Sequence, residues 1–227
     1  MPPSADRRSP AAVLWDMDGT LLDSERLWDV AVAELSARYG YPMTTELRES
    51  TLGNSMRDAL DKVYDAAALA PGERDHAGDE RRLLDRVAEL FAIDLPWRAG
   101  ARETLELVAS AGIPMALVTN TVRELTEQAL DTIGRHYFAA TVCGDEVIAG
   151  KPAPDPYRKA AALLGVDPGR CRAVEDSPTG AASATAAGCL TLVVPSTSPV
   201  PAGPLREFRT SLVGVTLAEL ATPDMRG

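Results

Sequence analysis

From about Leu95 onward, apolar strand-like runs alternate with amphipathic helical stretches. The strand-like runs read "IPMALVTN", "AATVCG", "CRAVEDS" and "CLTLVVPS", and a helical pattern lies between each pair. Such alternation predicts a parallel sheet with helices on both faces, because each strand has to return to the same edge of the sheet through a crossover. The run "AAVLWD" near the amino terminus adds one more buried strand. We therefore predict an α/β fold, with "CLTLVVPS" as its final strand.

A helical block interrupts this alternation after the first strand. From Ser24 to about Phe91 the apolar residues recur at helical spacing, and no strand signal separates the helices. The predicted domains are a core domain made of residues 1–22 and 95–227 and an inserted all-helical domain made of residues 23–94. The opening "MPPSADRRSPAA" is typical of a loose tail, and "VPSTSPVPAGP" of a surface loop.

Composition excludes several classes of function. The formal net charge is -10, which argues against nucleic acid as a partner because phosphate backbones are bound by clustered Lys and Arg. No run of about 18 apolar residues predicts a membrane span. The three cysteines are widely spaced and are expected to be reduced, buried thiols. We therefore expect a cytoplasmic protein, either a monomer or a weak homo-oligomer.

Polar residues follow four of the predicted strands, at the positions where ligands bind in open parallel sheets. The residues are Asp16, Asp18, Thr119, Asn120, Lys151, Glu175 and Asp176. Because the carboxyl ends of parallel strands meet at one edge, we expect these side chains to form a single site.

Several carboxylates with one lysine favour a bound cation. Converging acids cannot all remain ionised and unpaired, and Mg²⁺ commonly binds one or two carboxylates together with the phosphate oxygens of a substrate. One aspartate could then act as a nucleophile and its neighbour could move the proton. Lys151 and the Thr119 hydroxyl could stabilise a phosphoryl group, and Gly19 would let the backbone turn closely round it. Neither a GxGxxG nor a P-loop pattern is present, and neither His76 nor His136 is placed as a catalytic base.

Four segments, "DMDGT", "VTN", "GKPAPDPY" and "VEDSPTGAASATAAG", resemble in order the four motifs of the haloacid dehalogenase superfamily. The resemblance implies a Rossmann-like core and makes the inserted helices the cap of the first subclass. It implies Asp16 as the nucleophile, Asp18 as the general acid and base, Thr119 as the phosphate binder and Lys151 as the residue that steadies the phosphoryl group. By the same resemblance, Mg²⁺ would be held by Asp16, the backbone carbonyl of Asp18, and Asp176, with Glu175 close by or coordinating.

The same motifs indicate a particular branch of the superfamily. Dehalogenases lack the second acid of the first motif, so Asp18 favours phosphate chemistry. The "ED" pair with "SPTG" resembles the branch of β-phosphoglucomutase and small sugar phosphatases, and "DSERLWD" with "STLGNSM" resembles phosphatases of hexitol phosphates and of 2-deoxyglucose 6-phosphate. The resemblance implies a small phosphorylated metabolite, a sugar or polyol phosphate, as substrate.

Three other functions stay open at this point: a phosphosugar mutase, a phosphoglycolate phosphatase, and a signalling module that is phosphorylated on Asp16. Against the mutase, Met56 stands directly after "GNS" where the mutase has a basic residue, and Arg57 comes one place later. The residues predicted to bind the substrate are Gly19, Asn120 and, from the inserted helices, Glu25, Trp28, Asn54, Ser55 and Arg57.

Overall fold

A computed structural model describes residues 7–51 and 56–223 of the chain. These residues form two compact units, residues 1–23 with 96–227 and residues 24–95. We call them the core unit and the helical unit. No helix among the described residues combines the length and the apolar character that a bilayer-spanning helix requires.

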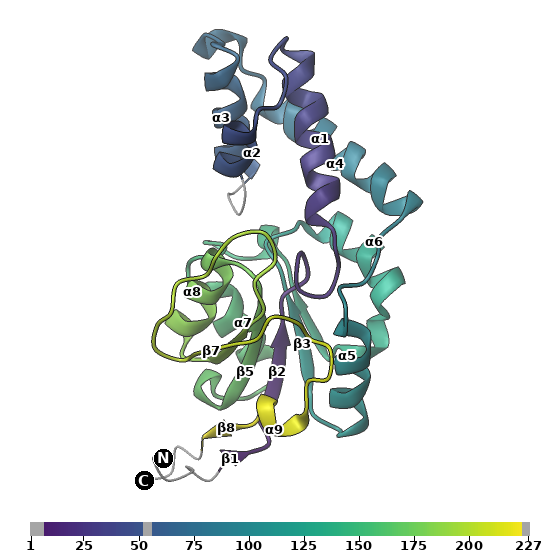
Figure 1. Cartoon of the computed structure of the whole chain (residues 1–227), viewed down its shortest axis with the longest axis vertical. Coiled ribbons are helices and arrows are strands. Elements are labelled where there is room, and N and C mark those ends of the chain that lie inside the picture. Colours follow the sequence, from purple (N-terminus) through teal and green to yellow (C-terminus); the bar gives the residue numbers. More distant parts are fainter. Residues whose placement is uncertain (1–6, 52–55, 224–227) are drawn as a thin grey trace. The chain divides into compact units, whose positions relative to one another are not determined.

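The core unit is built on a parallel sheet, which in the described residues has six strands in the order β4, β3, β2, β5, β6, β7 (Figure 1). Its strands are β2 (Ala12–Trp15), β3 (Met115–Val118), β4 (Ala140–Val142), β5 (Cys171–Glu175), β6 (Leu190–Val193) and β7 (Arg206–Phe208). All adjacent pairs are parallel. The four central strands are buried along their whole length, which is why they appear in the sequence as unbroken apolar runs.

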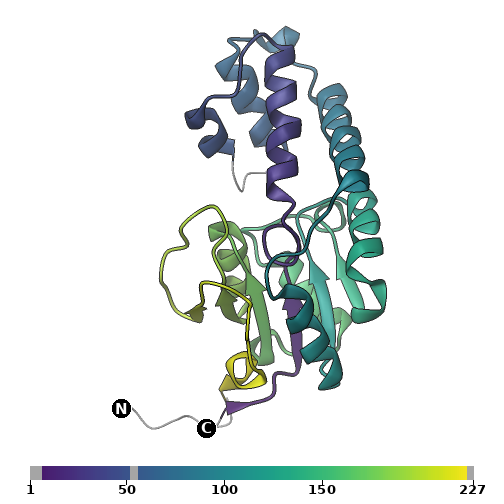
Figure 2. The ribbon, with the colours of Figure 1, turned by 45° about the vertical axis from the view of Figure 1, so that its right-hand side comes forward.

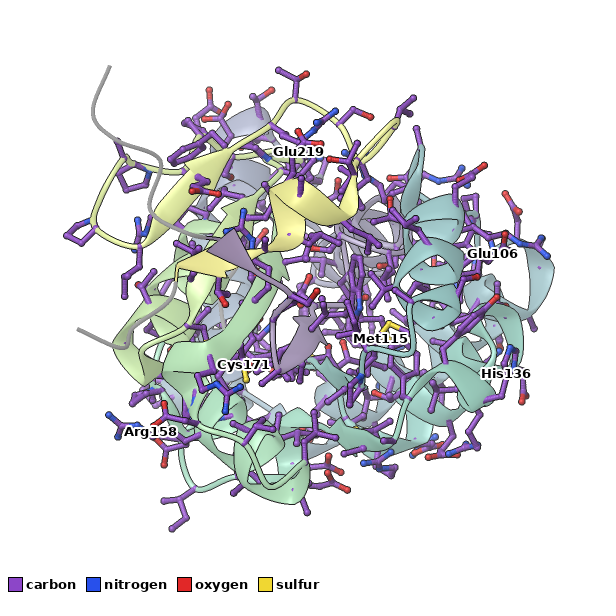
Figure 3. The ribbon with its side chains drawn as sticks, turned by 90° about the horizontal axis from the view of Figure 1, so that it is seen from below. Glu106, Met115, His136, Arg158, Cys171 and Glu219 are labelled. Carbon is purple, nitrogen blue, oxygen red and sulfur yellow. The ribbon has the colours of Figure 1, made fainter. Side chains whose placement is uncertain are left out.

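Helices cover both faces of this sheet. They are α5 (Ala101–Ser110), α6 (Arg123–Ile133), α7 (Asp155–Leu163), α8 (Pro178–Ala187) and the short α9 (Leu217–Leu220). Helices α5 and α6 lie on one face, and α7 and α8 lie on the other (Figures 1 and 3). This arrangement follows from right-handed crossovers, because the chain steps outward from β2 to β4 and then returns through α7 to β5 on the other side. The α/β prediction is confirmed.

Side chains from both helices and strands fill the core. Tyr157 and Ala160 on α7 pack with Leu14 and Ala173 of the sheet in one buried cluster. Viewed from below (Figure 3), Met115 and Cys171 lie inside the unit, whereas Arg158 lies at its periphery. All three cysteines are buried and free, as expected.

The chain beyond β6 differs from the prediction. The prediction that "CLTLVVPS" is the final strand was wrong, because β7 pairs with β6 at the edge of the sheet (Figure 2). Farther on, β8 (Thr222–Pro223) pairs antiparallel with β1 (Arg7–Arg8), so the predicted loose tail contains a short strand. These strands are short and carry polar residues, so they lack the apolar signal of the central strands.

The helical unit contains α1 (Glu25–Arg38), α2 (Thr45–Thr51), α3 (Met56–Ala66) and α4 (His76–Ile93). Helices α1 and α4 bury their apolar faces, including Leu35, Val87 and Phe91. A buried carboxylate, Asp79, accepts hydrogen bonds from the hydroxyls of Tyr39 and Tyr64, and the distance to Tyr64 Oη is 2.8 Å. Helix α2 carries one buried apolar side chain.

Candidate active site

The candidate catalytic side chains lie where three adjacent strands of the core unit end. Asp16 follows β2, Thr119 follows β3, and Glu175 is the last residue of β5. Since β2 lies between β3 and β5, the parallel arrangement brings these three strand ends together. Lys151 reaches the same place from the loop that follows β4.

An ammonium group between two carboxylates forms the centre of the site. Lys151 Nζ lies 2.6 Å from Asp16 Oδ1 and 2.7 Å from Glu175 Oε1. All three side chains are almost fully buried, so solvent screens their charges poorly. The sequence predicted that these strand ends would meet, and the structure brings Asp16 and Glu175 each within hydrogen-bonding distance of Lys151.

The imbalance of charge shifts the pKa values of these groups. Burial, and then the neighbouring Glu175 carboxylate, raise the pKa of Asp16 to about 7, although Lys151 opposes the shift. Burial acts to lower the pKa of Lys151, but Asp16 and Glu175 together outweigh it and raise the pKa above its usual range. Lys151 therefore stays charged, whereas Asp16 is held in an environment that disfavours its anion.

Tyr157 completes this centre and was missed by the sequence reasoning. Its hydroxyl, on the buried face of α7, donates a 2.5 Å hydrogen bond to Glu175 Oε1. Burial and the charge of Glu175 raise the pKa of Tyr157 well above its ordinary value, so the hydroxyl remains a donor. The residue belongs to the segment "GKPAPDPY", but its helical position indicates a core aromatic as readily as a hydrogen-bond donor.

Three carboxylates are close enough to share a cation. One oxygen each from Asp16, Glu175 and Asp176 lie within 4.8 Å of one another. Asp16 Oδ2 is buried, and no donor from the described residues reaches it, although a buried carboxylate oxygen needs a partner. A hard divalent cation with oxygen ligands fits this donor set. Ser196, which the sequence reasoning also missed, donates a 2.5 Å hydrogen bond to Asp176 Oδ2.

Asp18 faces the end of β3. Its Oδ2 accepts hydrogen bonds from Thr119 Oγ1 at 3.1 Å and from Thr121 Oγ1 at 2.7 Å. The hydroxyl of Thr119, predicted to bind phosphate, therefore contacts Asp18. Thr121 was not predicted, because a threonine at the start of a helical pattern is an ordinary capping residue.

The backbone conformation and the close packing at residue 19 explain why a glycine stands there. Gly19 has φ +78°, and a Cβ atom there would overlap the carboxylate of Asp176. A residue with a side chain would therefore be strained in its backbone and would displace a candidate metal ligand. Asn120, which is predicted to bind the substrate, contacts the backbone of Lys151: Lys151 N donates to Asn120 Oδ1 at 2.8 Å, and Asn120 Nδ2 donates to Lys151 O at 3.2 Å.

The predicted substrate residues of the helical unit stay predictions. Glu25 is the first residue of α1, Trp28 lies one turn later, and Arg57 lies exposed near the start of α3. Asn54 and Ser55 lie outside the described residues.

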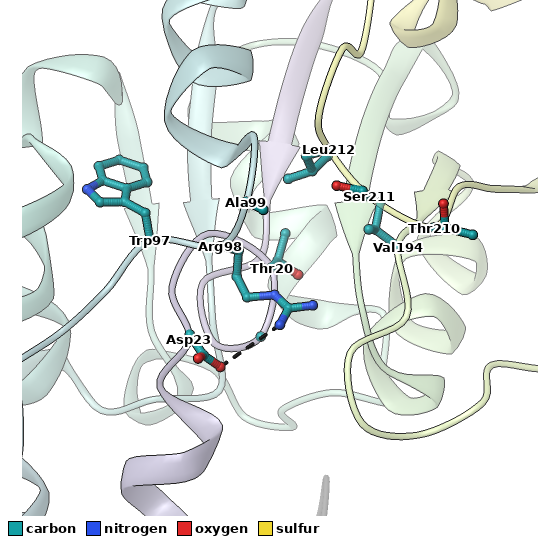
Figure 4. A pocket seen from close by; sticks show the side chains of 10 residues that line it. Thr20, Asp23, Trp97, Arg98, Ala99, Val194, Thr210, Ser211 and Leu212 are labelled. Carbon is teal, nitrogen blue, oxygen red and sulfur yellow. Dashed lines mark ion pairs between the residues drawn. The ribbon is translucent and has the colours of Figure 1, made fainter.

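A hollow of about 280 Å³ lies in the core unit beside the two segments that lead to and from the helical unit (Figure 4). Its lining includes Gly19, Thr20, Asp23 and Arg98 but not Asp16 or Lys151. Arg98 Nη1 lies 3.9 Å from Asp23 Oδ1, and Arg98 N donates to Leu21 O at 2.8 Å. The segments thus pair with each other within the core unit.

Comparison with known proteins assigns the class of this fold and site. Residues 10–188 match the family model of the haloacid dehalogenase-like hydrolases. The chain belongs to this family.

Similar proteins indicate which kind of hydrolase the chain is. The chain is 33% identical over 178 residues to the phosphorylated carbohydrates phosphatase of Thermotoga maritima, covering 78% of this chain and 81% of that protein. It is 31% identical to hexitol phosphatase B of Escherichia coli K12, covering 83% and 85%. The crystal structure of CbbY from Rhodobacter sphaeroides in complex with phosphate superposes with a TM-score of 0.83 at 28% identity, covering 93% and 99%. The protein is a phosphatase of this family.

Proposed function

We propose that this phosphatase hydrolyses the phosphoric monoester of a small sugar or polyol through an aspartyl-phosphate on Asp16, with Mg²⁺ as cofactor. The observation that carries the proposal is the buried Asp16 carboxylate, which has one oxygen on Lys151 and the other without a donor from the described residues. A carboxylate that is held in place but not saturated by hydrogen bonds is suited to form a bond to phosphorus.

In this proposal Asp16 attacks phosphorus and Lys151 stabilises charge. The ammonium group, fixed by Asp16 and Glu175, lies beside the nucleophile, where the equatorial oxygens of the phosphoryl group carry negative charge in the transition state. Glu175 accepts a hydrogen bond from Lys151 and so holds the ammonium group, and Tyr157 in turn donates to Glu175.

Asp18 would move the proton in both halves of the reaction. In the first half it gives a proton to the oxygen of the departing alcohol, and in the second it takes one from the water that attacks the aspartyl-phosphate. Its hydrogen bonds to Thr119 and Thr121 fix the orientation of the carboxyl group. A receiver-type signalling module would have no use for such a group.

The residues that would hold the metal are Asp16 and Asp176, with the backbone carbonyl of Asp18. Glu175 is close enough to contribute, but its Oε1 already accepts hydrogen bonds from Lys151 and Tyr157. When bound, Mg²⁺ supplies positive charge that neutralises the phosphate oxygens and favours the ionised form of Asp16.

The sugar or polyol part of the proposal rests on the relatives, which are named for phosphorylated carbohydrates and hexitols. In this proposal the helical unit is a cap that supplies contacts to the leaving group. Glu25, Trp28 and Arg57 would make them, because an acid, an indole and a guanidinium can all recognise hydroxyl-rich groups.

Phosphate release from a panel of sugar, polyol, glycolate and nucleotide monophosphates tests the proposal. Each substrate is assayed with Mg²⁺ and with EDTA, using Asp16→Asn as the blank and the exposed Asp131→Asn of α6 as the matched control. We expect release that requires Mg²⁺ and Asp16 and is fastest on hexose or hexitol phosphates.

Two outcomes would contradict it. Turnover by Asp16→Asn comparable with that of wild type would exclude Asp16 as the nucleophile. Conversion of β-glucose 1-phosphate to glucose 6-phosphate, with no phosphate released from any member of the panel, would replace the phosphatase by a mutase.

A further inference from the structure

The hollow of about 280 Å³ in the core unit is formed by segments that are far apart in the chain (Figure 4). Its lining comes from residues 19–23, 97–99 and 210–212, together with Val194 after β6. Among the described residues predicted for the active site, only Gly19 lies in its wall. The volume is near the lower end of the range of about 300–1,000 Å³ that small-molecule pockets span. The hollow therefore has the size for one small ligand.

Arg98 brings a charged donor to this hollow. Its backbone N–H donates to Leu21 O at 2.8 Å, and its carbonyl accepts from Ala101 N at 3.0 Å, so its main chain is fixed just before α5. The guanidinium lies 3.9 Å from the carboxylate of Asp23, which is beyond the range of a hydrogen bond. The two groups attract each other, but at this distance Asp23 does not take up a donor of Arg98. One third of the Arg98 side chain is exposed, so a ligand can reach the guanidinium.

Hydroxyl groups from two other segments border the same hollow. Thr20 is almost fully buried, and no group among the described residues is bonded to its Oγ1. A buried hydroxyl normally has a hydrogen-bond partner, and a ligand in the hollow would stand beside this one. Ser211 Oγ accepts a hydrogen bond from Val213 N at 3.1 Å, so its own proton can be donated elsewhere. The side chain of Trp97 points away from these groups (Figure 4).

The lining favours a neutral ligand that carries hydroxyl groups. An anion would pair with Arg98 but would be repelled by Asp23, and a cation would meet the reverse. A hydroxyl can accept from the guanidinium and donate to the carboxylate at the same time. Asp23 also interacts elsewhere in the protein, but a carboxylate accepts several hydrogen bonds. The C–H groups of such a ligand can contact the apolar side chains of Val194 and Leu212.

We propose that this hollow binds a small neutral polyol through Arg98, Asp23 and Thr20. The ligand carries no phosphate, and it binds apart from the phosphoryl chemistry at Asp16, so the inference does not rest on the proposed function. Residues 19–23 and 97–99 lead to and from the helical unit. A polyol in the hollow would join these two segments to residues 210–212 of the core unit.

An NMR titration with sorbitol tests the proposal. The backbone amides of residues 97–99 and 210–212 report on the hollow, and those of residues 119–121 report on the active site. Sodium sulfate is titrated in parallel as an anionic probe, and both titrations are made in EDTA without substrate. We expect sorbitol to cause saturable shifts at the hollow, with a Kd in the millimolar range because a ligand of this size makes few contacts.

Two variants test which groups bind the polyol. Arg98→Met removes the guanidinium, keeps a long side chain and should weaken sorbitol binding about tenfold or more. Thr20→Val keeps the shape of threonine and should weaken it about threefold or more. Because the Thr20 hydroxyl has no partner among the described residues, its loss should leave the fold intact, and Thr20→Val carries the test if Arg98→Met does not fold. The exposed Arg102→Met of α5 is the matched control and should bind sorbitol as wild type does.

Three results would overturn the proposal. The first is the absence of saturable sorbitol shifts at the hollow, including shifts confined to the active-site amides. The second is an unchanged sorbitol affinity in both Arg98→Met and Thr20→Val. The third is saturation of the hollow by sulfate but not by sorbitol, with tighter sulfate binding in Asp23→Asn, which would make the hollow an anion site. Failure of the proposed function is distinguishable, because it appears as turnover that survives Asp16→Asn and not as a change in binding.

Discussion

Replacing Asp16 by Asn should abolish turnover and, in the absence of Mg²⁺, make the folded protein more stable. Asp16 and Glu175 are two buried carboxylates that share the one ammonium group of Lys151. Burial and the neighbouring charge make the ionised form of Asp16 unfavourable in the fold. An asparagine at this position removes the charge and still offers Lys151 a carbonyl oxygen.

The size of the effect follows from the pKa shift. A pKa of about 7 in place of 3.8 means that ionised Asp16 lowers the free energy of unfolding at pH 8 by about 4 kcal/mol. This shift already contains the opposing attraction and hydrogen bond from Lys151. Replacing the ionised carboxylate by a neutral amide should therefore raise the free energy of unfolding by about 4 kcal/mol, which corresponds to a rise in Tm of about 8–16 °C for a chain of this size.

The pH dependence has a definite sign. Because the pKa of Asp16 is raised in the fold, the contribution of Asp16 to the free energy of unfolding falls as pH rises from about 4 to about 7 and is then constant. Asn does not titrate, so the advantage of the variant should shrink by about 2–3 kcal/mol between pH 8 and pH 5.

Thermal unfolding in EDTA at pH 8 and pH 5 measures the difference in stability between wild type and Asp16→Asn. Asp131→Asn is the control for loss of an exposed charge. Saturating Mg²⁺ should narrow the gap at pH 8, because it binds the ionised wild type. A variant that unfolds at or below the wild-type Tm at pH 8, with no trend between the two pH values, would refute the reasoning.

Two further predictions concern the hydroxyl groups that the sequence did not reveal. Ser196→Ala should weaken Mg²⁺ binding about tenfold, because Asp176 loses its 2.5 Å hydrogen bond from Ser196. Isothermal titration calorimetry measures the affinity, and an unchanged affinity would exclude a role of Ser196 in orienting Asp176. Tyr157→Phe should lower the free energy of unfolding by about 1–3 kcal/mol, since a buried carboxylate, Glu175, loses a donor. Urea denaturation measures this, with Tyr137→Phe as the control. Equal shifts of the denaturation midpoint in the two variants would contradict the role of the Tyr157 hydroxyl.

The central strands could be predicted from the sequence because burial on both faces leaves a continuous apolar run, as in "AAVL" before Asp16. The parallel arrangement then brings Asp16, Lys151 and Glu175 together, since their loops all leave the same edge of the sheet. Strand β7 could not be predicted, because its three residues are only partly buried or exposed and look like a loop.

The hydroxyl contacts of the site lay beyond sequence reasoning for a different physical reason. Thr121, Tyr157 and Ser196 reach a carboxylate only through the relative placement of two elements that are far apart in the chain. A threonine before a helix, a tyrosine on a buried helix face and a serine in a loop each have an ordinary local explanation. Periodicity carries no information about such pairings.

The two hydrogen bonds between Asn120 and the backbone of Lys151 bear on how this enzyme can be re-engineered. A Cβ atom on Gly144 would overlap the backbone of Asn120, and one on Gly150 would lie 2.8 Å from Asn120 Oδ1. The loop that carries Lys151 and the turn after β3 therefore fit each other at three positions of that loop, Gly144, Gly150 and Lys151. A chimera that imports either segment alone from another member of the family would misplace the ammonium group, so the two segments have to be grafted together.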